Sequence, residues 1–99
     1  MPIKRNRRPT HPGAILREDI LPEINLSVDE LADALAISRQ NLKEILDENA
    51  HITADIAHRF GRAFGMSPDI WLRMQQAVDL YDTQQENEAA YSQIERIAA

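Results

Sequence analysis

The sequence predicts an all-helical domain organised around two short helices joined by a tight turn, and three observations support this prediction. Apolar residues recur three and four positions apart along most of the chain, which is the spacing of one helical face. The segments that show this spacing begin with residues that cap helices, and several end at proline or glycine. Only 3 glycines occur among 99 residues, and β-branched runs are absent, which disfavours strands.

The chain opens with a basic arm, residues 1–10, followed by the first predicted helix, residues 10–21. Thr10 or His11 can cap this helix, and Pro12 suits its first turn because an N–H at that position would have no partner. Pro22 ends it. The buried stripe of this helix is expected to consist of Ile15, Leu16 and Ile20.

The central stretch, residues 27–48, carries two helix starts only eleven residues apart. Ser27 and Glu30 form a capping box, in which each side chain accepts a hydrogen bond from the other residue's amide. Ser38 can cap the second helix. A short turn around Ala36 joins the two, and Ala36 is expected to adopt a positive φ there. Such a pair is a helix-turn-helix.

Two further helices complete the domain. Thr53 caps the fourth, which Gly65 ends, and Ser67 followed by Pro68 begins a fifth that runs through Tyr81. These signals divide the chain into the arm, 1–10, a helical domain, 11–81, and a C-terminal tail, 82–99. Three outcomes stay open for the tail, namely continuation of the fifth helix, a separate short helix, or a partly disordered end.

The charge is unevenly distributed. The formal net charge is −5, with +4 in residues 1–13 and −9 in the remainder. An acidic body is unusual for a nucleic-acid-binding domain, in which a basic face supplies much of the affinity. The arm therefore has two interpretations, a solubilising tail or a phosphate-contacting segment.

Several classes of function are disfavoured by the composition. No cysteine is present, so we expect no disulfide and no thiol nucleophile, in keeping with a cytoplasmic protein. No apolar run has the length of a membrane span. The histidines lack metal-ligand spacing. The acids Asp29, Glu30 and Asp33 are interpreted as a solvated helix face because no partner base or nucleophile accompanies them. We therefore expect no enzyme, no metal and no cofactor.

Several short motifs, in order and at compatible spacing over residues 11–80, resemble one family. These are His11-Pro12-Gly13-x-x-Leu16-Arg17-Glu18, Leu31-Ala32, Ser38-Arg39-Gln40, Glu44-Ile45-Leu46, Ile52-Thr53-Ala54-Asp55 and Met66-Ser67-Pro68-Asp69-x-Trp71-Leu72. Together they are similar to the HigA antitoxins, also called VapI-like, within the Cro/C1-type (XRE) helix-turn-helix family. The resemblance implies a five-helix, lambda-repressor-like fold.

The resemblance also implies a function. Such proteins are dimeric repressors that bind double-stranded operator DNA, neutralise a HigB-type toxin similar to RelE-like mRNA endonucleases, and repress the shared operon. The matching positions imply a DNA-binding set at the two helix starts. We expect base or phosphate contacts from Ser27, Ser38, Arg39, Gln40, Asn41 and Lys43.

A second copy of the chain would let two such helices read half-sites about 34 Å apart. The apolar face of the fifth helix is the expected dimer interface, formed by Trp71, Met74 and Val78. One departure from the family is the acidic connector Asp47-Glu48, which would face phosphate unless it turns away, so we expect weakened DNA binding. Two alternatives are a regulator of the same fold without a toxin and a helical adaptor that has lost DNA binding.

Overall fold

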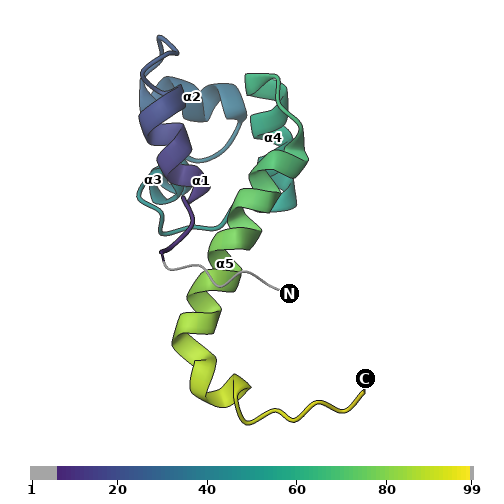
Figure 1. The fold of residues 1–99 in the computed structure, drawn as a ribbon. Coiled ribbons are helices and arrows are strands. Elements are labelled where there is room, and N and C mark those ends of the chain that lie inside the picture. The colour runs from purple at the N-terminus through teal and green to yellow at the C-terminus, as the bar shows by residue number, and fades with distance from the viewer. Residues whose placement is uncertain (1–6, 99) are drawn as a thin grey trace.

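The computed structural model describes residues 7–98, and all regular secondary structure in that range is helical (Figure 1), which confirms the predicted fold class. Most of the basic arm, residues 1–6, lies outside the described residues. The elements are, in order, α1 (Pro12–Ile15), the π-helical turn η1 (Leu16–Ile20), α2 (Val28–Leu35), α3 (Arg39–Leu46), α4 (Ala54–Phe64) and α5 (Pro68–Tyr91).

Several predicted helix caps and the predicted stop at Gly65 are confirmed. His11 caps α1 by accepting the Gly13 amide, and Ser27 and Glu30 form both hydrogen bonds of the capping box. Thr53 and Ser67 cap α4 and α5, and Gly65 ends α4 at φ 67°. Local sequence chemistry therefore fixes where these helices begin and end.

The first helix differs from a plain α-helix in its second half. The Leu21 amide donates to the Leu16 carbonyl, five residues back, at 2.9 Å, and this defines the wider turn η1. The wide turn sets both Ile20 and Leu21 against the core, although they are adjacent in sequence. The sequence spacing did not predict this turn.

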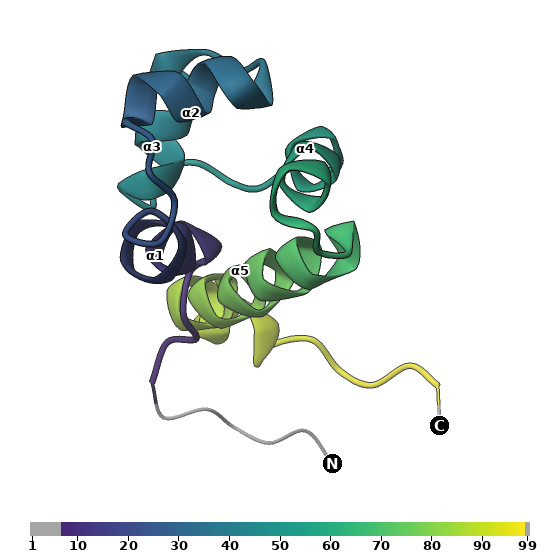
Figure 2. The ribbon, with the colours of Figure 1, turned by 90° about the horizontal axis from the view of Figure 1, so that it is seen from above.

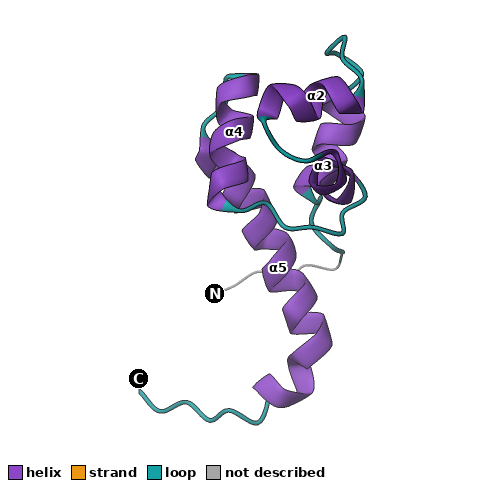
Figure 3. Cartoon of the chain, turned by 180° about the vertical axis from the view of Figure 1, so that it is seen from behind, coloured by secondary structure: helices purple, strands orange, loops and turns teal. Residues whose placement is uncertain are grey.

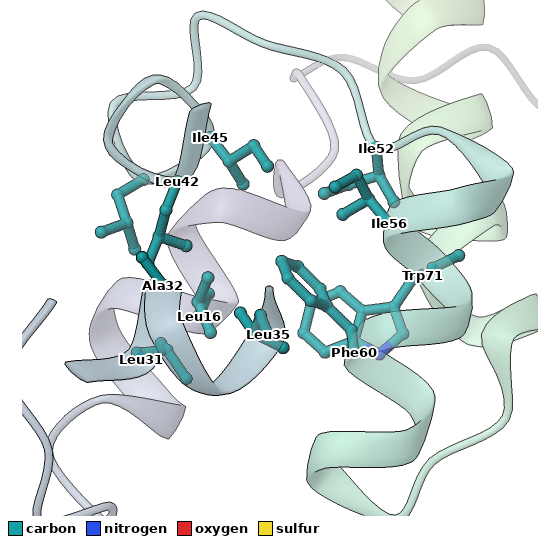
Figure 4. Close-up of a cluster of buried hydrophobic side chains, with 12 residues drawn as sticks. Leu16, Leu31, Ala32, Leu35, Leu42, Ile45, Ile52, Ile56, Phe60 and Trp71 are labelled. Atoms are coloured by element: carbon teal, nitrogen blue, oxygen red, sulfur yellow. The ribbon is translucent and has the colours of Figure 1, made fainter. Parts of the chain in front are cut away.

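The core lies where all five helices meet (Figure 4). Figure 2 shows α1, α2 and α3 on one side and α4 and α5 on the other. Leu31 and Leu35 from α2 face Leu42 and Ile45 from α3, and all four are at most 3% exposed. Ala32, a small residue on the same side of α2, is also buried, at 2% exposure. The apolar sides of these two helices are therefore the buried ones.

Gly13 allows α1 to approach α3 closely. A Cβ atom added at Gly13 would collide with the main-chain carbonyl oxygen of Ile45, near the end of α3. The backbones of the two helices are therefore in direct contact at this point, and no side chain separates them. This packing explains why a glycine stands inside the first turn of a helix, where it is otherwise unfavourable.

The prediction that Trp71 and Val78 form a dimer interface is wrong. Trp71 is 0% exposed and Val78 1% exposed within a single chain, so neither side chain has surface left for a partner. The Trp71 ring packs edge-on against Phe60, with centroids 4.8 Å apart, and lies 6.0 Å from Phe64. These aromatic contacts hold α4 against α5. Met74 is half-buried and keeps some exposed surface.

Helix α5 is 24 residues long and does not end at position 82. Figure 3 shows it extending away from the other helices. The tail combines two of the outcomes left open for it, because the helix continues past residue 82 to a kink at Asn87, where the dihedral angles are not helical, and a short helical segment follows to Tyr91. Residues from 83 onward are exposed, so this part of the helix projects beyond the core. Among the described residues, no helix is both long and apolar enough to cross a membrane.

His11 gives the fold a pH dependence that can be tested. Burial lowers the pKa of His11 below its ordinary value of 6.5, and its Nδ1 must stay unprotonated to accept the Gly13 amide at 2.9 Å. As the pH falls through about 6.5, the unfolded chain gains a proton that the folded chain does not, so the free energy of unfolding falls.

We expect His11→Asn, which can still cap the helix but does not titrate, to lose less stability between neutral and mildly acidic pH than the wild type. Urea denaturation at a series of pH values measures this difference. Equal pH dependence in the two proteins would contradict the role given to His11.

Candidate nucleic-acid interface

The exposed side of α3 carries most of the predicted DNA-contacting residues. Leu42, Ile45 and Leu46 anchor this helix in the core, which turns Arg39, Gln40 and Lys43 outward on the opposite side. Ser27 and Ser38 are exposed at the starts of α2 and α3. Asn41 is half-buried, and its backbone N–H donates a hydrogen bond to the Ser38 hydroxyl at 3.0 Å. The structure thus brings five of the six predicted residues to the surface and places Asn41 at its edge.

A rigid turn sets the angle between α2 and α3. Ala36 adopts the left-handed conformation at φ 54°, as predicted, and the Ile37 amide donates back to the Ala32 carbonyl at 3.1 Å. A left-handed conformation costs an alanine about 1 kcal/mol relative to glycine. Arg59 on α4 helps to offset this cost by donating to the carbonyls of Leu35 and Ala36 at 3.0 and 2.9 Å.

Arg59 on α4 contacts both its own helix and the turn between α2 and α3. Its Nε donates to Asp55 at 2.9 Å, one helical turn back, while its terminal nitrogen reaches the turn between α2 and α3. The partners in that turn lie 23 and 24 residues earlier in the chain. Helical spacing shows that Arg59 is not on the apolar side of α4. It gives no indication that the side chain contacts a turn more than twenty residues earlier in the chain.

Two acidic side chains accompany the outward residues of α3. Arg39 Nε lies 2.7 Å from a carboxylate oxygen of Asp29 on α2. The Gln40 amide donates to Glu44 at 3.0 Å, one turn along the same helix. Lys43 adds a second cation to this surface, and Asp47 another acid. The surface is therefore of mixed charge, which favours contacts to individual base edges over a general attraction to phosphate.

The acidic connector after α3 is partly neutralised from within the chain. Glu48 stands at φ 64°, and its carboxylate accepts from Arg8 at 3.2 Å and from Arg17 at 3.3 Å. Arg17 also donates to the Leu46 carbonyl at the end of α3. Glu48 thus turns toward the first helix and the base of the arm, whereas Asp47 stays exposed. This is the alternative in which a connector acid turns away.

Arg8 joins the arm to α5 as well as to the connector. Its guanidinium donates two hydrogen bonds to Asp82, at 2.9 and 3.0 Å, and these lower the pKa of the Asp82 carboxyl. One of the four arm cations is therefore engaged with two carboxylates inside the chain. These pairs are partly exposed, so each contributes at most about 1 kcal/mol to stability.

Gln75 is a structural residue that the sequence interpretation missed. It is 4% exposed on α5 and accepts the Ile52 amide at 2.8 Å, which fixes the segment leading from α3 to α4. Its amide nitrogen donates to Asp79 at 2.9 Å and lies 3.0 Å from His51 Nδ1. A glutamine on the buried face of a predicted helix was the available signal, because a buried amide requires partners.

Comparison with known proteins places this architecture among antitoxins and helix-turn-helix regulators. No model of a known protein family matches the chain. The virulence-associated protein I of Dichelobacter nodosus is 42% identical over 90 residues, which cover 90% of this chain and 83% of that protein.

Two solved structures are similar over nearly the whole chain. The Pseudomonas aeruginosa antitoxin HigA, solved with the higBA promoter, is 36% identical with a TM-score of 0.85, covering 92% of this chain and 100% of the other. The antitoxin GraA in complex with its operator is 34% identical with a TM-score of 0.87, covering 98% and 99%.

Proposed function

Because this chain belongs to the family of HigA and VapI-like antitoxins, we propose that it is a sequence-specific DNA-binding repressor and the antitoxin of a type II toxin–antitoxin pair. It binds the operator of its own operon and neutralises a HigB-type toxin, similar to a RelE-like mRNA endonuclease. It acts by binding and not by catalysis, in the cytoplasm where the operator is. The supporting observation is the exposed first turn of α3, held at a fixed angle by a capped and rigid turn.

Different side chains around that turn are expected to contact different parts of the DNA. Arg39 can donate two parallel hydrogen bonds to a guanine edge, and Gln40 can pair with adenine. Asn41 is half-buried at the edge of this surface, so we expect it to contact a base at the edge of the site. Lys43 contacts a base or a phosphate, and the Ser27 and Ser38 hydroxyls contact phosphates on either side.

The affinity of a single domain is expected to be low because the reading surface carries three acids, Asp29, Glu44 and Asp47, and only two cations, Arg39 and Lys43. Two copies that bind together compensate for this, since each contributes one α3 helix to one of two half-sites. We place the contact between the copies on the uncovered side of α5. The proposed contact includes Met74, which is half-buried, and Leu80, whose side chain is 64% exposed. Leu80 lines an open groove with Ile52 and Leu72.

Leu80→Lys is expected to weaken the dimer and lower operator affinity while leaving the free energy of unfolding of the single chain nearly unchanged. The physical reason is that an exposed leucine adds little to the core, whereas a lysine in a dimer contact would be desolvated. Analytical ultracentrifugation measures the dimer, and urea denaturation checks the fold. Gln84→Lys, at an exposed position on the same helix beyond this groove, is the matched control. An unchanged dimer in Leu80→Lys would remove Leu80 from the interface.

The function itself is tested in two steps. In a mobility-shift titration at about 150 mM salt, the protein should bind the DNA upstream of its own gene in preference to unrelated DNA of equal length. In co-expression, it should restore growth to cells that produce the adjacent toxin. Loss of the DNA preference would favour the adaptor alternative, and DNA binding without rescue would favour a regulator that has no toxin.

A further inference from the structure

Arg39 is held by a carboxylate that belongs to the other helix of the pair. The Arg39 Nε and an Asp29 oxygen are 2.7 Å apart, and this contact spans from the first turn of α2 to the first residue of α3. Within residues 7–98, the Arg39 guanidinium forms no hydrogen bond that would tie it elsewhere. Asp29 is therefore the group that orients this arginine before DNA arrives.

The backbone of Asp29 is itself fixed in position. It lies between the two residues of the capping box, Ser27 and Glu30, whose hydrogen bonds hold the backbone of that turn. Two buried leucines on α2 and Leu42 on α3 lock the helices together beneath it. The Cα atoms of Asp29 and Arg39 thus belong to two rigid elements, so the fold keeps the two side chains within reach of each other.

The chemistry of the guanidinium decides what this contact does. Arginine presents five N–H donors, and a guanine edge takes two parallel ones. A carboxylate beside Nε leaves the terminal nitrogens available to pair with a base. Ordering a long side chain in advance also lowers the entropy lost when it binds. When α3 is bound to DNA, the negative charge of Asp29 would also repel the phosphates, which lowers the affinity for every DNA sequence alike.

We propose that Asp29 is a specificity-determining, positioning residue, which orients Arg39 toward one base pair and weakens binding to all DNA. This inference rests on the proposed function, since it requires α3 to read an operator. The ion pair is not needed for the fold, because both side chains are more than half exposed, at 70% for Arg39 and 57% for Asp29. Such pairs add little to stability.

The test compares Asp29→Asn with Asp33→Asn. Asp33 is an exposed acid one turn further along α2, and its side chain forms no ion pair among the described residues, so both variants lose one negative charge from the same helix. Arg39→Ala first identifies the base pair that Arg39 reads, as the operator position at which the preference disappears. Affinity is then measured for the operator, for operators substituted at that base pair, and for unrelated DNA.

Both asparagine variants should bind unrelated DNA somewhat more tightly than the wild type. Only Asp29→Asn should also lose discrimination at the base pair read by Arg39, by about three- to tenfold, which is part of the discrimination that a bidentate pair provides. If Asp29→Asn discriminates there as well as Asp33→Asn does, the inference is wrong although the reading role of α3 stands. If Arg39→Ala changes the preference at no position, the proposed reading role fails, and the inference fails with it.

Discussion

Trp71→Ala is expected to lower the free energy of unfolding by about 3–5 kcal/mol, the usual range when a buried aromatic side chain is truncated in a core. The ring is completely buried and touches Phe60 and Phe64, so its removal leaves a cavity between α4 and α5. Small domains are stable by about 5–15 kcal/mol. The variant should therefore be close to its unfolding threshold, and it should lose DNA binding because it loses the fold.

Denaturation in urea, followed by far-ultraviolet circular dichroism at several protein concentrations, measures this loss and separates it from dimer dissociation. Trp71→Phe is the informative control. It keeps most of the ring contacts and removes an indole N–H that is buried and has no hydrogen-bond partner among the described residues. We expect it to cost far less than the alanine variant. A Trp71→Ala protein with wild-type stability and a weakened dimer would instead restore Trp71 to the interface.

The double variant Arg39→Ala, Gln40→Ala is expected to keep its fold and lose its preference for the operator. Both side chains are exposed and neither contributes to the core, while alanine is well suited to a helix. A good bidentate contact to a base provides about 1–3 kcal/mol of discrimination, so losing two should lower the preference at least roughly 30-fold.

Selection of DNA from a random pool measures that preference directly. Arg62→Ala, which removes an exposed cation from α4, controls for the loss of positive charge away from α3. A double variant that still selects the wild-type sequence would show that the reading surface lies elsewhere. A double variant that no longer folds would contradict the assignment of these residues to the exposed side of α3.

The features that could be predicted from sequence are those determined by neighbouring residues. Capping depends on side chains within three positions of a helix start, so Ser27, Ser38 and Thr53 were all identified. The left-handed turn at Ala36 follows from the short distance between two capped helices. The exposed side of α3 follows in turn, because burying Leu42, Ile45 and Leu46 leaves only one side for the outward residues.

The features that could not be predicted depend on contacts between distant segments. An apolar face on α5 can cover a core or a partner, and helical spacing is the same in both cases, so Trp71 and Val78 were assigned to the wrong surface. The contact between Asp29 and Arg39 and the reach of Arg59 depend on how helices cross. Glu48 is a further case, since its charge suggested repulsion from DNA until Arg8 and Arg17 were found beside it.

The close approach of Gly13 to the Ile45 carbonyl has a consequence for how this scaffold can change. Side chains in a core vary in size over evolution, and a helix that rests on them shifts when they do. Here α3 rests partly on the main chain of α1, and main-chain atoms do not change when residues are replaced. We therefore expect that the outward positions 39, 40 and 43 can be redesigned for a new operator as a separate module, with the orientation of the helix retained.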